Sequence, residues 1–219
     1  MATRQVLADL AFAYERQTRV ATQVESVGGV DAAKRVQAGE AFDVVILASD
    51  AIDKLVAAGH AVPGSKVDIV RSGVAVAVRA GSPKPDLASE ASVRSAVLKA
   101  LSIGYSTGPS GTALLQLFER WGITEQVKGR LVQATPGIPV ASLIANGTVA
   151  LGFQQLSELL NVNGIEIAGD LPAAIQIVTI FSGAVCAAST QPQAVSELLA
   201  FMASPATAPA KQRQGMQPA

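Results

Sequence analysis

The sequence predicts an α/β fold with mostly parallel sheets and helices on both faces. Two observations indicate this class. The continuous apolar runs at residues 43–48 and 73–78 are typical of strands that are buried on both faces. Segments with helical spacing of apolar residues alternate with such runs along the chain. This alternation is typical of strand–helix–strand units, which make parallel sheets.

The first part of the chain begins with a predicted helix. Residues 3–17 place their apolar side chains on one face, which is the pattern of an amphipathic helix. Val20, Thr22 and Val24 alternate with polar neighbours, which predicts a strand. A lobe of this class usually begins with a strand that leads into the first helix. We therefore expect the opening strand to be missing or to lie upstream of Met1.

The rest of the chain alternates in the same way. A helix over residues 30–38 is expected to follow Gly28 and Gly29 and to end at Gly39. Asp50 is expected to cap a helix that runs to residue 58. Further helices are predicted over residues 92–100, from the 106–112 loop to residue 121, and over residues 140–145, 192–203 and 205–214. Further strands are predicted over residues 102–105, 131–134, 149–153, 165–168 and 175–181.

The composition excludes several functions. The 219 residues are 49% apolar and carry 17 basic and 17 acidic side chains, so a sizeable core is expected and a nucleic-acid partner is not. Aromatic residues make up only 4%, which argues against a platform for stacking sugars or bases. A single cysteine and a single histidine leave no disulfide and no cysteine- or histidine-based metal site. We expect no cofactor.

The N-terminal residues do not have the pattern of a secretory signal. Arg4 and Asp9 interrupt the apolar residues near Met1. No apolar run reaches the about 18–20 residues that span a bilayer, so no membrane insertion is expected. As the sequence stands the expected location is cytoplasmic, whereas a leader upstream of Met1 would make the protein periplasmic.

Several strings of residues resemble a known family. Residues 33–48, 71–80 and 150–158, together with the ending at residues 214–218, are similar to the molybdate-binding branch of the type II periplasmic binding proteins. The resemblance covers essentially the whole chain apart from the opening strand. It implies two α/β lobes joined by two crossing strands, with the ligand in a cleft between the lobes. Lobe one would comprise residues 1–76 and 182–219, and lobe two residues 77–181.

The resemblance also implies an oxyanion site built from hydroxyls and backbone N–H groups at helix N-termini. Such ends attract anions because their N–H groups are unpaired and the helix dipole is positive there. The matching positions are Gly28, Gly29 and Val30 in lobe one and Ser110, Gly111, Thr112 and Gly137 in lobe two. These segments also fit ordinary turns. Arg71 precedes a crossing strand and is a further candidate, because arginine binds carboxylates with two hydrogen bonds.

Two positions depart from the molybdate pattern. Gln154 or Gln155 stands where that branch has a tyrosine, and the serine of its first turn would fall at or before Met1. Residues 153–158 and 171–176 are more similar to another branch, which includes aconitate isomerases. A glutamine amide can donate to a carboxylate where tyrosine would donate to molybdate, so we include Gln155 in the site.

Three functions are compatible with these residues. The first is a solute-binding protein that captures a small anion, either a carboxylate or a molybdate-like oxyanion, and that works with an ABC transporter. The second is an isomerase of a small di- or tricarboxylate, with Glu158 as the candidate proton shuttle; a solvated carboxylate is the simpler interpretation of Glu158. The third is the ligand-sensing part of a transcription regulator, although no N-terminal helix-turn-helix pattern is visible.

Overall fold

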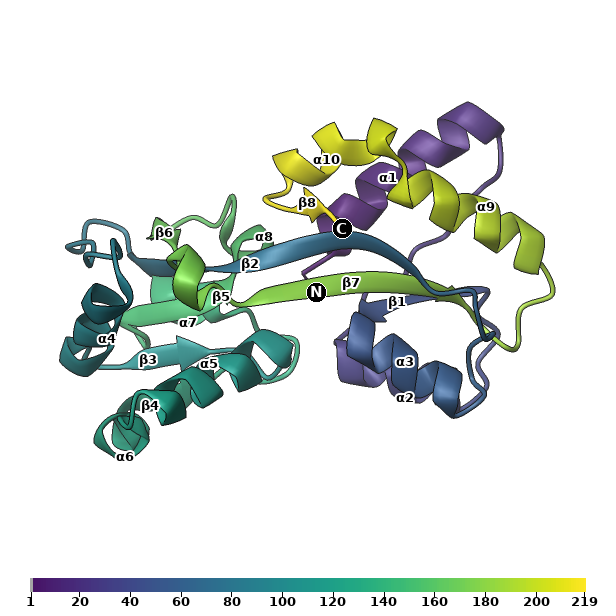
Figure 1. Cartoon of the computed structure of the whole chain (residues 1–219). Coiled ribbons are helices and arrows are strands. Elements are labelled where there is room, and N and C mark those ends of the chain that lie inside the picture. Colours follow the sequence, from purple (N-terminus) through teal and green to yellow (C-terminus); the bar gives the residue numbers. More distant parts are fainter. Residues whose placement is uncertain (1) are drawn as a thin grey trace. The chain divides into compact units, whose positions relative to one another are not determined.

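The computed structural model describes residues 2–219, which form two compact units (Figure 1). Unit 1 comprises residues 2–72 and 179–219, and unit 2 comprises residues 73–178. The chain passes from one unit to the other within strand β2 (Val67–Arg79) and again at the start of strand β7 (Val178–Val185). The lobe boundaries expected from the sequence lie a few residues further along the chain at both crossings.

The sheet of unit 1 is formed by strands that pair antiparallel. Strand β1 (Val44–Ala48) pairs with β7, with Val44 opposite Val185. In the same unit, Val70 and Arg71 of β2 pair with the short strand β8 (Gln217–Pro218). Residues 217–218, within the ending that resembles the family, therefore form an edge strand.

Helices cover both faces of the unit 1 sheet. One face packs against α1 (Arg4–Thr18) and α9 (Pro192–Ala203), which lie side by side in Figure 1, and the other against α2 (Gly29–Gln37) and α3 (Ser49–Ala57). The side chains of β1 alternate between the two cores. Ile46 packs with the α1 and α9 residues, whereas Val45 and Leu47 pack with those of α2 and α3. The remaining helical segments are η3 (Pro205–Thr207) and α10 (Ala208–Arg213).

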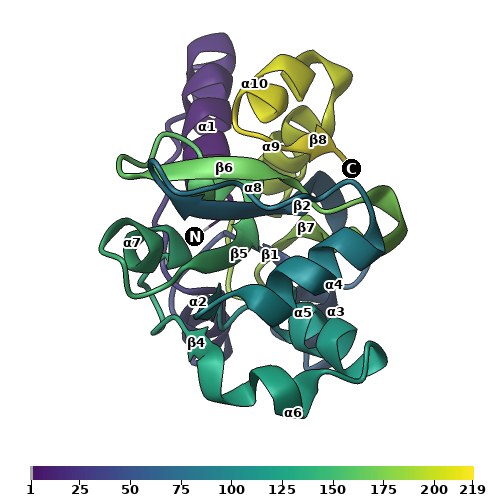
Figure 2. The ribbon, with the colours of Figure 1, turned by 90° about the vertical axis from the view of Figure 1, so that its left-hand side faces the viewer.

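Unit 2 has a mixed sheet, and Figure 2 shows β6 beside β2 at one side of it. Strand β3 (Ile103–Tyr105) lies between β4 (Leu131–Gln133) and β5 (Leu151–Gln155) and is parallel to both. Strand β2 pairs antiparallel with β5 on one edge and with β6 (Ile165–Asp170) on the other. The order is therefore β4–β3–β5–β2–β6.

The two faces of this sheet are covered by different helices. Helices α4 (Glu90–Lys99) and α5 (Pro109–Arg120) pack on one face, and α7 (Val140–Ala145) packs on the other. Glycine at position 152 lets α7 approach β5, because a Cβ there would lie 2.3 Å from the Ile144 side chain. The shorter helical segments are α6 (Thr124–Val127), η1 (Lys128–Arg130), α8 (Leu156–Leu159) and η2 (Ala173–Ile175).

Two local predictions are wrong. Residues 20–24 do not form a strand, because no other strand lies next to them to accept their backbone hydrogen bonds. Asp50 does not cap α3: the N-cap is Ala48, and Asp50 lies in the first turn. The expected parallel pairing is found among β3, β4 and β5, whereas the long strands β2 and β7 run antiparallel to their partners.

Candidate anion-binding site

The carboxyl ends of three parallel strands meet at one edge of the unit 2 sheet. These ends are Tyr105 of β3, Gln133 of β4 and Gln155 of β5. Helix α5 begins four residues after β3, and α7 follows β4 through an exposed loop that contains Gly137. Ser110, Gly137 and Gln155 therefore lie at the same edge, which is where open α/β sheets bind ligands.

Two serine hydroxyls lie together where the chain turns from β3 into α5. The Oγ atoms of Ser106 and Ser110 are 3.1 Å apart. Their mutual hydrogen bond uses one hydroxyl hydrogen and leaves the other free to donate. The backbone N–H of Ser110 donates to no backbone oxygen of the described chain, and it lies in the first turn of a helix that has proline at its first position.

The turn that leads from β3 into α5 and carries both serines requires glycine at position 111. A Cβ atom on Gly111 would lie 1.8 Å from the backbone oxygen of Ser106, far inside any real contact. The Gly111 N–H donates to the oxygen of Gly108 at 3.0 Å. Gly111 therefore lets the turn close tightly enough to bring the two hydroxyls together.

Gln154 and Gln155 are both buried, yet they have different surroundings. The Oε1 atom of Gln154 accepts from the backbone N–H of Ala141 at 3.3 Å, so this amide faces α7 and helps to fix its first turn. Gln155 points to the opposite face, because side chains alternate along a strand and its neighbour Phe153 packs with the α4 and α5 residues. Its Oε1 atom is buried and has no hydrogen-bond partner in the part of the chain described.

A buried amide oxygen without a partner calls for an explanation in a native fold, and a bound ligand is one. Gln155 is only 3% exposed and lies on the same face and edge as the start of α5. We call this arrangement of Ser106, Ser110 and Gln155 the serine–glutamine edge. Rotation of the glutamine amide exchanges its oxygen and nitrogen positions, so it can present its NH₂ group. The serine–glutamine edge then presents hydroxyl, amide and backbone N–H donors beside the N-terminus of α5, and such a group of donors can bind a small anion.

Glu158 lies on the short helix α8, just beyond this edge. Burial raises the pKa of its carboxyl, while the hydrogen bond with the Gln154 side chain acts in the opposite direction. Because Gln154 faces α7, this contact places the Glu158 carboxyl on the side of the sheet away from Gln155. Glu158 therefore lies beside α7, with the pKa of its carboxyl raised above the ordinary value.

The remaining predicted residues are divided between the two units. Thr112 is exposed on α5, and Gly137 has a φ of 83° in its exposed loop. Gly28, Gly29 and Val30 belong to unit 1, where Gly28 is the N-cap of α2. Arg71, also in unit 1, is exposed on β2 opposite Gln217 of β8.

Sequence reasoning missed Ser106 as a site residue. The available signal is its spacing of four residues from Ser110, across a loop that also contains glycine and proline. Sequence reasoning also could not separate Gln154 from Gln155, because the predicted strand ends at residue 153 whereas β5 continues to Gln155.

No metal-binding chemistry is found in residues 2–219. They contain no group of three or more histidine, cysteine, aspartate or glutamate side chains placed to hold an ion. Burial, together with the nearby Asp43 carboxylate, raises the pKa of the Cys186 thiol to about 11. The thiol is therefore protonated at neutral pH and acts as a small apolar side chain. No helix described here is long and apolar enough to cross a membrane.

Comparison with known proteins assigns the family. A family model described as bacterial extracellular solute-binding protein matches residues 1–217, and the chain belongs to this family. An aconitate isomerase of a Pseudomonas species is 38% identical over 218 residues, which cover 96% of this chain and 82% of that protein. The molybdate-binding protein ModA of Azotobacter vinelandii is 29% identical over 175 residues, covering 74% and 67%.

Solved structures of similar proteins share the fold. The periplasmic molybdate-binding protein of Azotobacter vinelandii has a TM-score of 0.80 at 21% identity, covering 98% of this chain and 95% of that one. Peb3 of Campylobacter jejuni has a TM-score of 0.73 at 13% identity, covering 99% and 96%. At these identities the likeness shows the fold alone, and it confirms the two-lobed type II class expected from the sequence.

Proposed function

We propose that this solute-binding protein takes a small anion with carboxylate groups, and that the serine–glutamine edge of unit 2 provides its main contacts. The buried Oε1 atom of the Gln155 amide, which has no partner among the described residues, is the observation that supports this proposal most strongly. A planar carboxylate has two oxygens, which can accept from a glutamine NH₂ group and from a serine hydroxyl or N–H group. Gly28, Gly29, Val30 and Arg71 of unit 1 remain predicted contacts.

The relatives favour a carboxylate over molybdate. The aconitate isomerase is more similar to this chain than the molybdate-binding protein is, at 38% against 29% identity, and its match covers more of the chain. Aconitate carries three carboxylates. Gln155 stands where the resemblance to the molybdate branch expects a tyrosine.

Replacing Gln155 by leucine tests the proposal. Gln155→Leu keeps the side chain close to its original size but removes both polar atoms of the amide. We expect trans-aconitate to bind about 10- to 100-fold more weakly, because a hydrogen bond to a charged group contributes about 1.5–3 kcal/mol. Gln116→Leu, on the exposed side of α5, is the matched control and should bind like the unaltered protein. Equal affinities for both variants, measured by calorimetry, would contradict the proposal.

Isomerisation of such a ligand is the second candidate function, and the similarity to an aconitate isomerase over nearly the whole chain favours it. The reaction needs a group that takes an allylic proton from the substrate and a proton that returns at another carbon. Glu158 is the candidate expected from the sequence, but its carboxyl lies beside α7, on the side of the sheet away from the serine–glutamine edge, so we assign no residue to this step. Incorporation of solvent deuterium into trans-aconitate by the unaltered protein is the expected result, and its absence would contradict isomerisation.

We also propose an ABC transporter as the partner and the periplasm as the compartment for the solute-binding function. One structural neighbour is a substrate-binding domain assigned to a molybdenum ABC transporter of Clostridium difficile, with a TM-score of 0.77 at 15% identity, covering 100% of this chain and 95% of that one. The family description as extracellular supports the compartment. Cell fractionation with protein made from the native gene tests the location, and uptake of labelled aconitate by cells with and without that gene tests the transporter.

A further inference from the structure

The three parallel strands of unit 2 end in polar side chains that share one face of the sheet. Tyr105 of β3 lies directly opposite Gln133 of β4. Ile103 and Leu131, two positions earlier in the same strands, pack with the α4 and α5 residues. Because side chains alternate along a strand, Tyr105 and Gln133 point to that face as well. It is the face to which Gln155 of β5 also points.

The ring of Tyr105 is held against the start of α5. It packs on the core that α4 and α5 cover, and a Cβ atom on Gly111 would lie 3.2 Å from its Cδ2 atom. The Tyr105 hydroxyl makes no recorded hydrogen bond within residues 2–219, and it is not one of the polar atoms there that are buried without a partner. Solvent therefore reaches this hydroxyl, which is free to donate to a ligand.

Gln133 provides a second free donor beside Tyr105. Its side chain is exposed at the end of β4, and no hydrogen bond of its amide is recorded in the described chain. The next residue, Ala134, donates its backbone N–H to the Tyr105 oxygen at 2.9 Å. This bond keeps the ends of β3 and β4 together, so the phenol and the amide stay neighbours.

These two donors lie close to the serine–glutamine edge without being part of it. In the parallel register of β3 and β5, Ile103 lies opposite Leu151, so Gln155 is two positions beyond the residue opposite Tyr105. The Cα atoms of Tyr105 and Gln155 are therefore about 8 Å apart, given a strand spacing of about 4.8 Å and a rise of about 3.3 Å per residue. A single carboxylate held by Ser110 and Gln155 would leave the donors of β3 and β4 unused.

We propose that Tyr105 and Gln133 bind a second carboxylate of the same ligand, so that the ligand of unit 2 carries at least two carboxylate groups. This inference rests on the proposed function, and it narrows the ligand from carboxylates in general to di- and tricarboxylates. Both donors are neutral, as in the serine–glutamine edge. Each makes a hydrogen bond to a charged acceptor, which is stronger than one between neutral groups.

Removal of the Tyr105 hydroxyl tests the second subsite. Tyr105→Phe keeps the ring and its packing, so the variant should fold normally. We expect it to bind trans-aconitate about 10- to 100-fold more weakly in calorimetry, which corresponds to the loss of one hydrogen bond to a charged group. Tyr14→Phe, which alters the other tyrosine of the chain and lies in unit 1, is the matched control and should bind like the unaltered protein.

A double variant shows whether the two pairs of donors hold different carboxylates. If they do, Tyr105→Phe combined with Gln155→Leu should weaken binding by about the product of the two single factors, because separate contacts contribute independently. A loss no greater than the larger single factor would mean that both residues hold one carboxylate, and it would overturn the second subsite. Gln133→Leu should also weaken binding, and unaltered affinity in that variant would remove Gln133 from the subsite and overturn the proposal as stated.

Fluorine NMR reports the contact itself. The chain has two tyrosines, so fluorotyrosine labelling gives two resonances, and Tyr105→Phe identifies the one that belongs to Tyr105. Saturation with trans-aconitate should shift this resonance, and a resonance that does not move would overturn the proposal. If the unaltered protein binds trans-aconitate and Tyr105→Phe binds it equally well, this inference fails and the proposed function stands. If the unaltered protein binds no carboxylate, both fail.

Discussion

At the scale of single residues, the turn between β3 and α5 depends on Gly111. Gly111→Ala would place a methyl group against the Ser106 carbonyl oxygen, so the turn must open. We expect a loss of about 1–3 kcal/mol in the free energy of unfolding, typical of overpacking, together with weaker anion binding. Gly129→Ala is the control, because its Cβ would meet no atom within 4 Å. Denaturant titration of the two variants measures the difference.

The residues of the candidate site differ in how well the sequence predicts their positions. Glycine and proline around Ser110 predict a turn that opens a helix, and the structure has this turn. The role of Gln155 could not be derived, because it depends on which face of β5 each side chain takes. That choice is set by the packing of α7 against Gly152 and Gln154, which the apolar pattern of a single strand does not report.

At the scale of elements, α10 contains a buried lysine without a partner. Lys211 is fully buried, and its Nζ atom has no hydrogen-bond acceptor among residues 2–219. Burial lowers the pKa of this amine from its ordinary 10.5. Because the folded state disfavours the charged form, the buried amine lowers the free energy of unfolding at every pH below its folded pKa. This loss shrinks as the pH rises from the folded pKa to 10.5, above which the amine is neutral in the unfolded chain as well.

Lys211→Met should therefore stabilise the protein. We expect a gain of about 1–3 kcal/mol at pH 7, which shrinks as the pH approaches 10.5. Arg213→Met, on an exposed position of the same helix, should change stability little. Thermal unfolding of both variants between pH 7 and 10.5 gives the comparison, and a gain that does not depend on pH would contradict the assignment to the buried charge.

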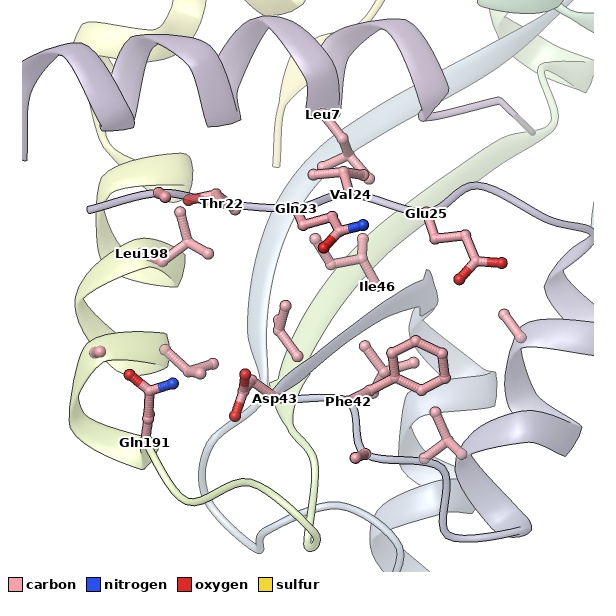
Figure 3. Close-up of a pocket in the computed structure, with 18 of the residues that line it drawn as sticks. Leu7, Thr22, Gln23, Val24, Glu25, Phe42, Asp43, Ile46, Gln191 and Leu198 are labelled. Atoms are coloured by element: carbon pink, nitrogen blue, oxygen red, sulfur yellow. The ribbon is translucent and has the colours of Figure 1, made fainter. Parts of the chain in front are cut away.

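Most helices could be predicted closely from their apolar periodicity, and those at Val140–Ala145 and Pro192–Ala203 have the expected bounds. The strand expected at residues 20–24 is the exception. Its alternating pattern fits a strand, but a strand also needs a partner, and a cavity of about 550 Å³ between these residues and β1 lies where that partner would be (Figure 3). The apolar pattern of a segment indicates which secondary structure it can form. Whether a strand forms also depends on a neighbouring strand with which it can pair.

At the scale of the whole molecule, the α/β class follows from buried apolar runs that alternate with amphipathic helices. The directions of the strands could not be derived in full. Strands linked by a crossover helix, such as β3 and β4, are parallel as expected, whereas β2 and β7 pass between the two units and run antiparallel to their partners. This arrangement leaves only β3, β4 and β5 with their carboxyl ends at one edge, and the candidate site lies there.

Calorimetric titration of the unaltered protein with trans-aconitate, citrate, molybdate and tungstate tests the proposed ligand class most directly. We expect micromolar or tighter binding of at least one of the two carboxylates and no measurable heat from molybdate or tungstate. The reason is that the serine–glutamine edge offers an amide where the molybdate pattern expects a tyrosine hydroxyl, and each unmatched acceptor of a buried oxyanion costs about 1–3 kcal/mol. Submicromolar binding of molybdate without any signal from the carboxylates would contradict it.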